Sequence, residues 1–150
     1  MTSCAVTSNH RPRAGYTLIE VALVLVVMGL TAAIGIRQLH FYLDRIATHD
    51  AVRSAGNLIE RARDESIALH TFVSVRVDTA TASLDLLARG LPAARAALGA
   101  VHGVALTTSR DSITFDVRGL GYGAANLTLV ATRGRAADTL TTSRLGRVRY

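Results

Sequence analysis

Five arginines near the C-terminus have a spacing that suits the binding of phosphate groups. They are Arg133, Arg135, Arg144, Arg147 and Arg149. In an extended strand Arg147 and Arg149 project to the same face, so two guanidinium groups can bind successive phosphates. Gly146, just before them, has no side chain and allows the backbone to approach a ligand closely. The first two, on either side of a glycine, form a second pair of this kind. Arginine on an edge strand also blocks unwanted strand pairing, so a purely structural role stays open.

Glu20 is a second residue of chemical interest, because its carboxylate lies at the start of a long apolar run. From Val21 to Ile36 the sequence contains no charged residue and no proline. A carboxylate inside a bilayer costs about 2.5–3.5 kcal/mol at the centre and less near the edge. We therefore expect Glu20 to have a cationic partner.

Nothing in the sequence predicts an enzyme, a cofactor site or a metal site. Cys4 is the only cysteine, and the histidines have no metal-ligand spacing. The glycine-rich stretch Gly119–Gly123 resembles a phosphate loop only superficially, because a strand and not a helix is expected to follow it. We interpret it as a hairpin loop.

The apolar run predicts a membrane helix. The 21 residues from Tyr16 to Ile36 would span roughly 31 Å as a helix, about the thickness of the hydrocarbon core. Arg11 and Arg13 precede the run, and the first 15 residues contain no acid, which predicts that this end stays in the cytoplasm. The small residue Gly15 precedes the run, whereas a secretory signal has its cleavage site after it.

The sequence Gly15-Tyr16-Thr17-Leu18-Ile19-Glu20 resembles the prepilin peptidase recognition site of type IV pilins and type II secretion pseudopilins. The resemblance implies cleavage after Gly15 by the prepilin peptidase, methylation of the new amino terminus at Tyr16, and retention of the apolar helix for assembly. It also implies that Glu20 neutralises the α-amino group of Tyr16 in a neighbouring subunit. Such pairing offsets the desolvation of both charges.

After Ile36 the pattern becomes amphipathic and predicts that the helix continues to about His70. Two apolar series follow helical spacing: Leu39, Leu43 and Ile46, and then Val52, Ala55, Ile59 and Ala62. The stretch Leu58–Ile67 resembles the L-x-x-x-A-R-x-E-A-I motif of the GspH/FimT family of minor pseudopilins and minor pilins, with Ser66 at the usual alanine. That resemblance implies a helix whose C-terminal half lies against a β domain.

The remainder predicts short antiparallel strands in one sheet region. The expected strands are 72–77, 82–87, 104–108, 112–117, 126–132 and 139–150, with a loop or short helix at 90–103. The predicted organisation is a leader (1–15), a transmembrane half-helix (16–36), an amphipathic half-helix (37–71) and a β-rich domain (72–150). The fold class is α+β and type IV pilin-like, with a long N-terminal helix packed on a small antiparallel β domain.

Two functions remain open at this point. The resemblance implies a single-pass subunit of the bacterial inner membrane, with its β domain in the periplasm and other pseudopilins or minor pilins as partners. The first hypothesis is a GspH-type minor pseudopilin of a type II secretion pseudopilus, a structural subunit for protein export. The second is a FimT-type minor pilin that binds double-stranded DNA for natural transformation, since the G-R-x-R sequence at Gly146–Arg149 resembles the C-terminal motif of those pilins. The formal charge of +6, carried by 17 arginines against 11 acids, permits but does not require nucleic acid.

Overall fold

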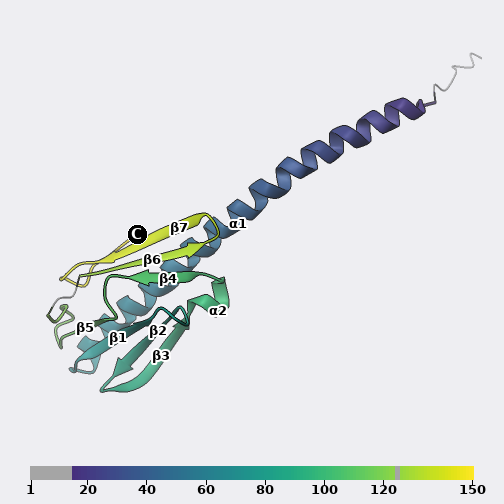
Figure 1. Cartoon of the computed structure of the whole chain (residues 1–150). Helices are drawn as coiled ribbons and strands as arrows, with labels where there is room; N and C mark the ends of the chain where they lie inside the picture. The colour runs from purple at the N-terminus through teal and green to yellow at the C-terminus, as the bar shows by residue number, and fades with distance from the viewer. Residues whose placement is uncertain (1–14, 124–125) are drawn as a thin grey trace, which may run out of the picture. The chain divides into compact units, whose positions relative to one another are not determined.

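The computed structural model describes residues 15–123 and 126–150, which divide into two units between Arg37 and Gln38. The predicted leader, including Arg11 and Arg13, lies outside the described residues apart from Gly15. Helix α1, Leu18–Ala68, contributes to both units (Figure 1).

The end of α1 is fixed by a left-handed residue. His70 has a φ of 48°, the Thr71 N–H donates to the Ser66 carbonyl at 3.2 Å, and the His70 N–H donates to the Ile67 carbonyl at 3.3 Å. These bonds satisfy carbonyls that the last helical turn would otherwise leave unpaired. The chain then enters the first strand.

The second unit contains two four-stranded antiparallel sheets and not the single sheet region that the sequence predicts. The first has the order β3-β2-β1-β5, with β1 Val73–Asp78, β2 Ser83–Ala88, β3 Leu91–Ala97 and β5 Ser112–Phe115. The second has the order β4-β6-β7-β8, with β4 Ala105–Thr108, β6 Leu127–Arg133, β7 Ala136–Thr142 and β8 Val148–Arg149. The short helix α2, Leu98–His102, connects β3 to β4.

Three local predictions are wrong. We predict a loop or short helix over 90–103; the short helix is present as α2, but residues 91–97 form strand β3, for which alanine is a weak signal. The expected strand 139–150 is two strands, β7 and β8, separated by a turn at 143–146. The loop at Gly119–Gly123 connects β5 to β6, which belong to different sheets, so it does not join two paired strands as predicted; only the isolated antiparallel bridge between Phe115 and Gly121 closes a local turn there.

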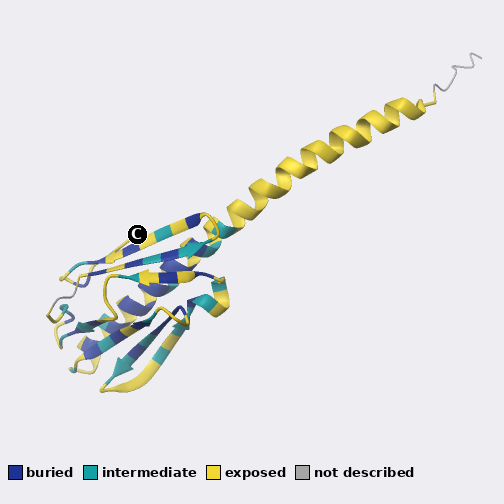
Figure 2. Cartoon of the chain, in the orientation of Figure 1, coloured by how far each residue is buried: buried dark blue, intermediate teal, exposed yellow. Residues whose placement is uncertain are grey.

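Both sheets and α1 share one hydrophobic core. Buried positions of α1, such as Val52, Ala55, Ile59 and Ala62, cluster with Phe115 and buried side chains of both sheets. Figure 2 shows buried positions, in dark blue, on the second part of α1 and on strands of both sheets. The earlier series with the same helical spacing is exposed: Leu39, Leu43 and Ile46 are 55%, 50% and 40% accessible. Helical periodicity therefore identifies an apolar face in both series, but only the second has a sheet to cover it.

Candidate functional site

Residues 15–37 of the first unit present an exposed apolar helix. All of them are exposed, including Leu25 and Leu30 at 63% each. The helix is long and apolar enough to cross a membrane once. The hydroxyl of Thr31 donates to the Val27 and Met28 carbonyls at 3.0 Å each, so this polar group is satisfied within the helix, as hydrocarbon surroundings require.

Thr17 caps the beginning of α1 and places Glu20 in its first turn. The Glu20 N–H donates to the Thr17 hydroxyl at 3.3 Å and to the Thr17 carbonyl at 3.1 Å. Thr17-Leu18-Ile19-Glu20 thus has the spacing of a capping box, a signal that our sequence analysis missed. The position in the first turn of the helix favours a negative charge. The Glu20 carboxylate forms no ion pair with any described residue.

The GspH/FimT-like stretch 58–67 is the part of α1 that meets the β domain. Leu58, Ala62 and Ser66 are buried on one face. The Ser66 hydroxyl donates to the Arg63 carbonyl at 2.7 Å, so serine is accommodated where the motif usually has alanine. The Arg63 Nε donates to the Gly119 carbonyl at 3.0 Å, which ties the helix to the β5–β6 connection.

Arg144, Arg147 and Arg149 lie together around the β7–β8 turn and are exposed. The Gly146 N–H donates to the Ser143 carbonyl at 2.9 Å and closes the turn. Gly146 has a φ of 71°, in the left-handed region that glycine adopts readily. None of the three guanidinium groups forms an ion pair with a described residue.

Two carboxylates share the surface with Arg147 and Arg149. A pocket of about 390 Å³ is lined by Arg147, Arg149, Glu60 and Asp64, together with Arg63, Gly146 and Val148. Glu60 and Asp64 belong to α1 and are exposed. The local charge is therefore mixed, which weakens the attraction for phosphate relative to what the sequence suggests.

The structure separates the other two arginines from this group. Arg135 is exposed in the β6–β7 turn, at the opposite end of β7, roughly 20 Å along the strand from the β7–β8 turn. The Arg133 Nε forms a 3.0 Å ion pair with Asp44 of α1, and its Nη1 donates to the His102 carbonyl. Arg133 therefore joins α1, β6 and the end of α2, and does not form a free pair with Arg135.

Tyr150 contacts α1 at a position that sequence analysis did not identify. Gly56 is buried, and a methyl group at this position would overlap the Tyr150 hydroxyl and ring. Glycine thus allows the C-terminal ring to lie directly on the helix. This contact holds β8 and Arg149 beside α1.

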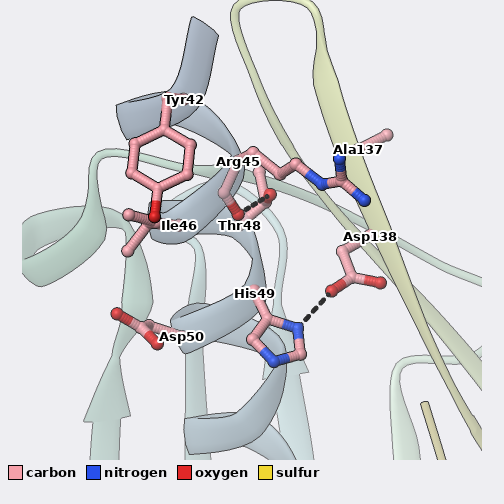
Figure 3. Close-up of a pocket in the computed structure, with 8 residues that line it drawn as sticks. All are labelled: Tyr42, Arg45, Ile46, Thr48, His49, Asp50, Ala137 and Asp138. Carbon is pink, nitrogen blue, oxygen red and sulfur yellow. Dashed lines mark hydrogen bonds and ion pairs between the residues drawn. The ribbon is translucent and has the colours of Figure 1, made fainter. Parts of the chain in front are cut away.

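A pocket of about 580 Å³ lies between α1 and β7 (Figure 3). It is lined by Tyr42, Arg45, Ile46, Thr48, His49, Asp50, Ala137 and Asp138. The His49 Nδ1 lies 3.0 Å from Asp138 Oδ2 and links the two elements. Within residues 15–123 and 126–150, no group of three or more His, Cys, Asp or Glu side chains is arranged to hold a metal ion.

Comparison with solved structures identifies the architecture. A crystal structure of the type IV minor pilin FimU from Pseudomonas aeruginosa is similar with a TM-score of 0.59 and 16% identity, covering 72% of this chain and 90% of that one. The chain has a type IV pilin-like fold. A second FimU crystal form gives a TM-score of 0.55 at 16% identity, covering 67% of this chain and 90% of that one.

The minor pseudopilin EpsH from the type 2 secretion system of Vibrio cholerae has the same pilin-like fold. Its TM-score is 0.54 at 16% identity, and the match covers 68% of this chain and 94% of EpsH. The neighbours are thus named as subunits of pili or pseudopili and not as enzymes. No protein-family profile and no curated protein sequence matches the chain.

Proposed function

We propose that this chain is a GspH/FimT-family filament subunit of the bacterial inner membrane, with its β domain in the periplasm. In the first instance it is a minor pseudopilin of a type II secretion pseudopilus. The prepilin peptidase removes residues 1–15, and the amino terminus of Tyr16 is methylated. The helix from Tyr16 to Ile36 holds the subunit in the membrane and later packs against other pilin-like subunits.

The observation that carries this proposal is the exposed apolar helix with one carboxylate at its beginning. Large apolar side chains that the protein itself does not cover need lipid or another helix around them. Glu20 forms no ion pair within the described chain, so its charge is available to a partner. The α-amino group of Tyr16 in a neighbouring subunit is a partner of the right charge and depth.

The test replaces Glu20 and measures assembly. Glu20→Ala should still be inserted and processed, because losing the carboxylate makes insertion easier, but it should co-purify poorly with other pilin-like subunits. Glu20→Asp is the charge-preserving control and should retain more assembly. Normal incorporation of Glu20→Ala would argue against the proposal.

DNA binding is the second candidate, and the three exposed arginines of the β7–β8 turn favour it. Arg144, Arg147 and Arg149 leave their guanidinium groups without an ion pair among the described residues. Each phosphate contact contributes about 0.9 to the slope of log affinity against log salt. Arg133 forms an ion pair with Asp44 and is therefore not part of this candidate site, and Arg135 would contact DNA separately.

The DNA test is a fluorescence-anisotropy titration of the detergent-solubilised chain with double-stranded DNA at several salt concentrations. Replacing Arg147 and Arg149 together by Gln should lower the magnitude of the slope by up to roughly 2. The charge-matched control replaces Arg89 and Arg110, which are exposed elsewhere on the domain, and should change the slope less. Absent binding, or equal effects of the two double variants, would leave the pseudopilus role as the better account.

A further inference from the structure

Most of one edge of strand β7 is uncovered. In the second sheet β7 lies between β6 and β8, but β8 pairs only with Thr141 and Thr142. Continuing the same antiparallel register places Tyr150, the residue after β8, opposite Leu140. No described residue pairs with positions 136–139 on this side of β7. We call this segment, roughly 13 Å of strand, the open edge.

The open edge presents main-chain groups that point away from β6. The Ser109 N–H donates to the Thr128 carbonyl at 2.9 Å, so Thr128 faces β4. Main-chain groups of successive strand residues point in opposite directions, so the odd-numbered residues of β6 face β7. Their partners in β7 are the even-numbered residues, which leaves Ala137 and Thr139 facing outward. The Thr139 N–H agrees with this direction, because it donates to the Asp138 carboxylate at 2.8 Å.

Other sheet edges of the described chain are protected in ways that the open edge is not. β3 contains Pro92 and a register shift, β5 is covered by Tyr122, whose N–H donates to that strand, and β4 has only four residues. Proline, irregular register and short length prevent unwanted strand pairing. Positions 136–139 contain no proline and no register shift. Their one protective charge is Asp138, which is paired with a histidine of α1.

The open edge lines the 580 Å³ pocket between α1 and β7 (Figure 3). Ala137 and Asp138 form the strand side of this pocket, and its other lining residues belong to α1. The helix therefore limits the space beside the edge to a single extended segment. A second copy of this chain does not fit, because its own open edge has a helix beside it and a two-fold pairing would bring the two Asp138 side chains together.

Arg45 supplies a cation beside the open edge. Figure 3 shows its guanidinium group reaching from α1 toward Ala137. This group forms no ion pair with a described residue. Arg135, in the adjacent β6–β7 turn, is exposed and also has no ion pair in the described chain. Arg45 is thus available to a carboxylate of a bound segment.

The carboxylates near the open edge do not neutralise Arg45. Asp138 Oδ2 lies 3.0 Å from His49 Nδ1, and Asp44 forms a 3.0 Å ion pair with Arg133. Asp50 has no ion pair among the described residues, but Figure 3 shows it on the side of α1 away from the strand. The strand side of the pocket therefore contains two satisfied carboxylates and one cation without a counter-ion in the described chain.

We propose that the open edge binds an extended segment of a partner polypeptide, which joins the second sheet as a strand antiparallel to β7. The Ala137 N–H and carbonyl each form a hydrogen bond with the segment, and the Thr139 carbonyl accepts another. A carboxylate side chain of the segment lies opposite Ala136, on the inner face of the sheet, and pairs with Arg45. This inference goes beyond the filament role and does not depend on it.

The test is an NMR titration of the isotope-labelled, detergent-solubilised full chain with the peptide acetyl-Val-Thr-Val-Glu-amide. In the proposed register its residues lie opposite positions 139, 138, 137 and 136 in that order. We expect saturable binding with a Kd of about 1 mM or below, and the largest amide shifts at Ala137 and Thr139. At saturation the Ala137 amide hydrogen should exchange at least about five-fold more slowly, because it gains an acceptor.

Two N-methylated peptides distinguish strand pairing from non-specific adhesion. Methylation of the second valine removes the N–H that donates to the Ala137 carbonyl, and should weaken binding by at least about ten-fold. Methylation of the threonine is the matched control, because its N–H points away from β7, and should weaken binding by less than about three-fold. Both peptides act on the unaltered protein, so a folding defect cannot explain a difference.

Arg45→Ala tests the charged contact. It should weaken binding by at least about three-fold and remove the preference for glutamate over glutamine at the last position of the peptide. Arg110→Ala is the charge-matched control, since Arg110 is exposed elsewhere on the domain, and should leave the affinity unchanged.

Several results would overturn the inference. They are an absence of saturable binding, shifts that are largest at β3 or β4, equal losses for the two N-methylated peptides, and equal effects of Arg45→Ala and Arg110→Ala. Shifts at Ala137 that depend on protein concentration without peptide would identify a second copy as the occupant and would also overturn it.

Discussion

The two halves of α1 differ in what covers them, and the more apolar half is the one left bare. Between Leu18 and Ile36 the large apolar side chains are exposed, whereas Val52, Leu58 and Ile59 are buried in the core. The buried face of the second half also contains small residues, among them Ala55 and Gly56, which let sheet and C-terminal residues approach closely.

Apolarity and burial are therefore separate properties of a helix. In a protein that folds in water alone, the first half would be the better core helix. Its exposure means that it needs another apolar environment, either lipid or neighbouring helices. The second half contains both polar and apolar residues, and a single apolar face along the helix is sufficient to complete the core of the β domain.

The largest expected effect tests the difference between the two halves of α1. Ile59→Ala removes a fully buried side chain and should lower the free energy of unfolding of the β domain by about 2–5 kcal/mol. Leu25→Ala, an apolar truncation in the first half, should change it by less than about 0.5 kcal/mol. Thermal unfolding of the detergent-solubilised chain measures both, and equal losses would contradict the division between the halves.

A smaller effect is expected at Gly56, where Tyr150 covers the second half. Gly56→Ala gains about 1 kcal/mol of helix propensity but displaces the Tyr150 ring. The substitution should therefore be close to neutral or destabilising in the unaltered chain, and stabilising by up to about 1 kcal/mol in a Tyr150→Ala background. A double-mutant cycle measures the difference, and additive effects would show that the contact contributes nothing.

The ion pair of Asp44 with Arg133 lies near the point on α1 where exposure gives way to burial. Arg133→Gln removes this 3.0 Å pair and the bond to the His102 carbonyl, and should cost about 1 kcal/mol. Arg135→Gln, two residues away and exposed, should change stability by less than about 0.5 kcal/mol. Indistinguishable unfolding midpoints for the two variants would refute the structural role of Arg133.

The smallest expected effect concerns Asp116, which organises the loop that lies on the second half of α1. The hydrogen bond from the Leu120 N–H, supported by Arg118, lowers the pKa of Asp116 below its ordinary value of 3.8. Because the folded-state pKa is depressed, the resulting stability is present above that value and is lost as the pH falls through the lower pKa. Asp116→Asn should therefore lower the unfolding midpoint at pH 7, and the difference should shrink toward pH 2.

The sequence predicts those features of the fold that depend on local pattern. Helical spacing identifies Val52, Ala55, Ile59 and Ala62, and all four are buried. Alternating β-branched residues identify strands such as β1 and β6, but the alanine-rich β3 has no comparable pattern. The division into two sheets also has no local signal, because strand order depends on pairing between distant segments.

The candidate sites show the same limit. Arg133 and Arg135 form a pair in the sequence, yet Asp44 is distant in the chain and engages only one of them. The contact of Tyr150 with Gly56 and the carboxylates beside Arg147 likewise join residues that only the fold brings together. The capping residue Thr17, by contrast, has a local signal that could have been found.

The central claim is that the exposed half of α1 is retained as the mature N-terminus of a filament subunit. Intact-mass and N-terminal peptide analysis of the membrane-extracted protein tests it most directly. The account predicts a chain that begins at N-methylated Tyr16, with replacement of Gly15 by a larger residue leaving the precursor uncleaved. A mature chain that begins at Met1, or one that begins after Ile36 and so has lost the apolar helix, would contradict it.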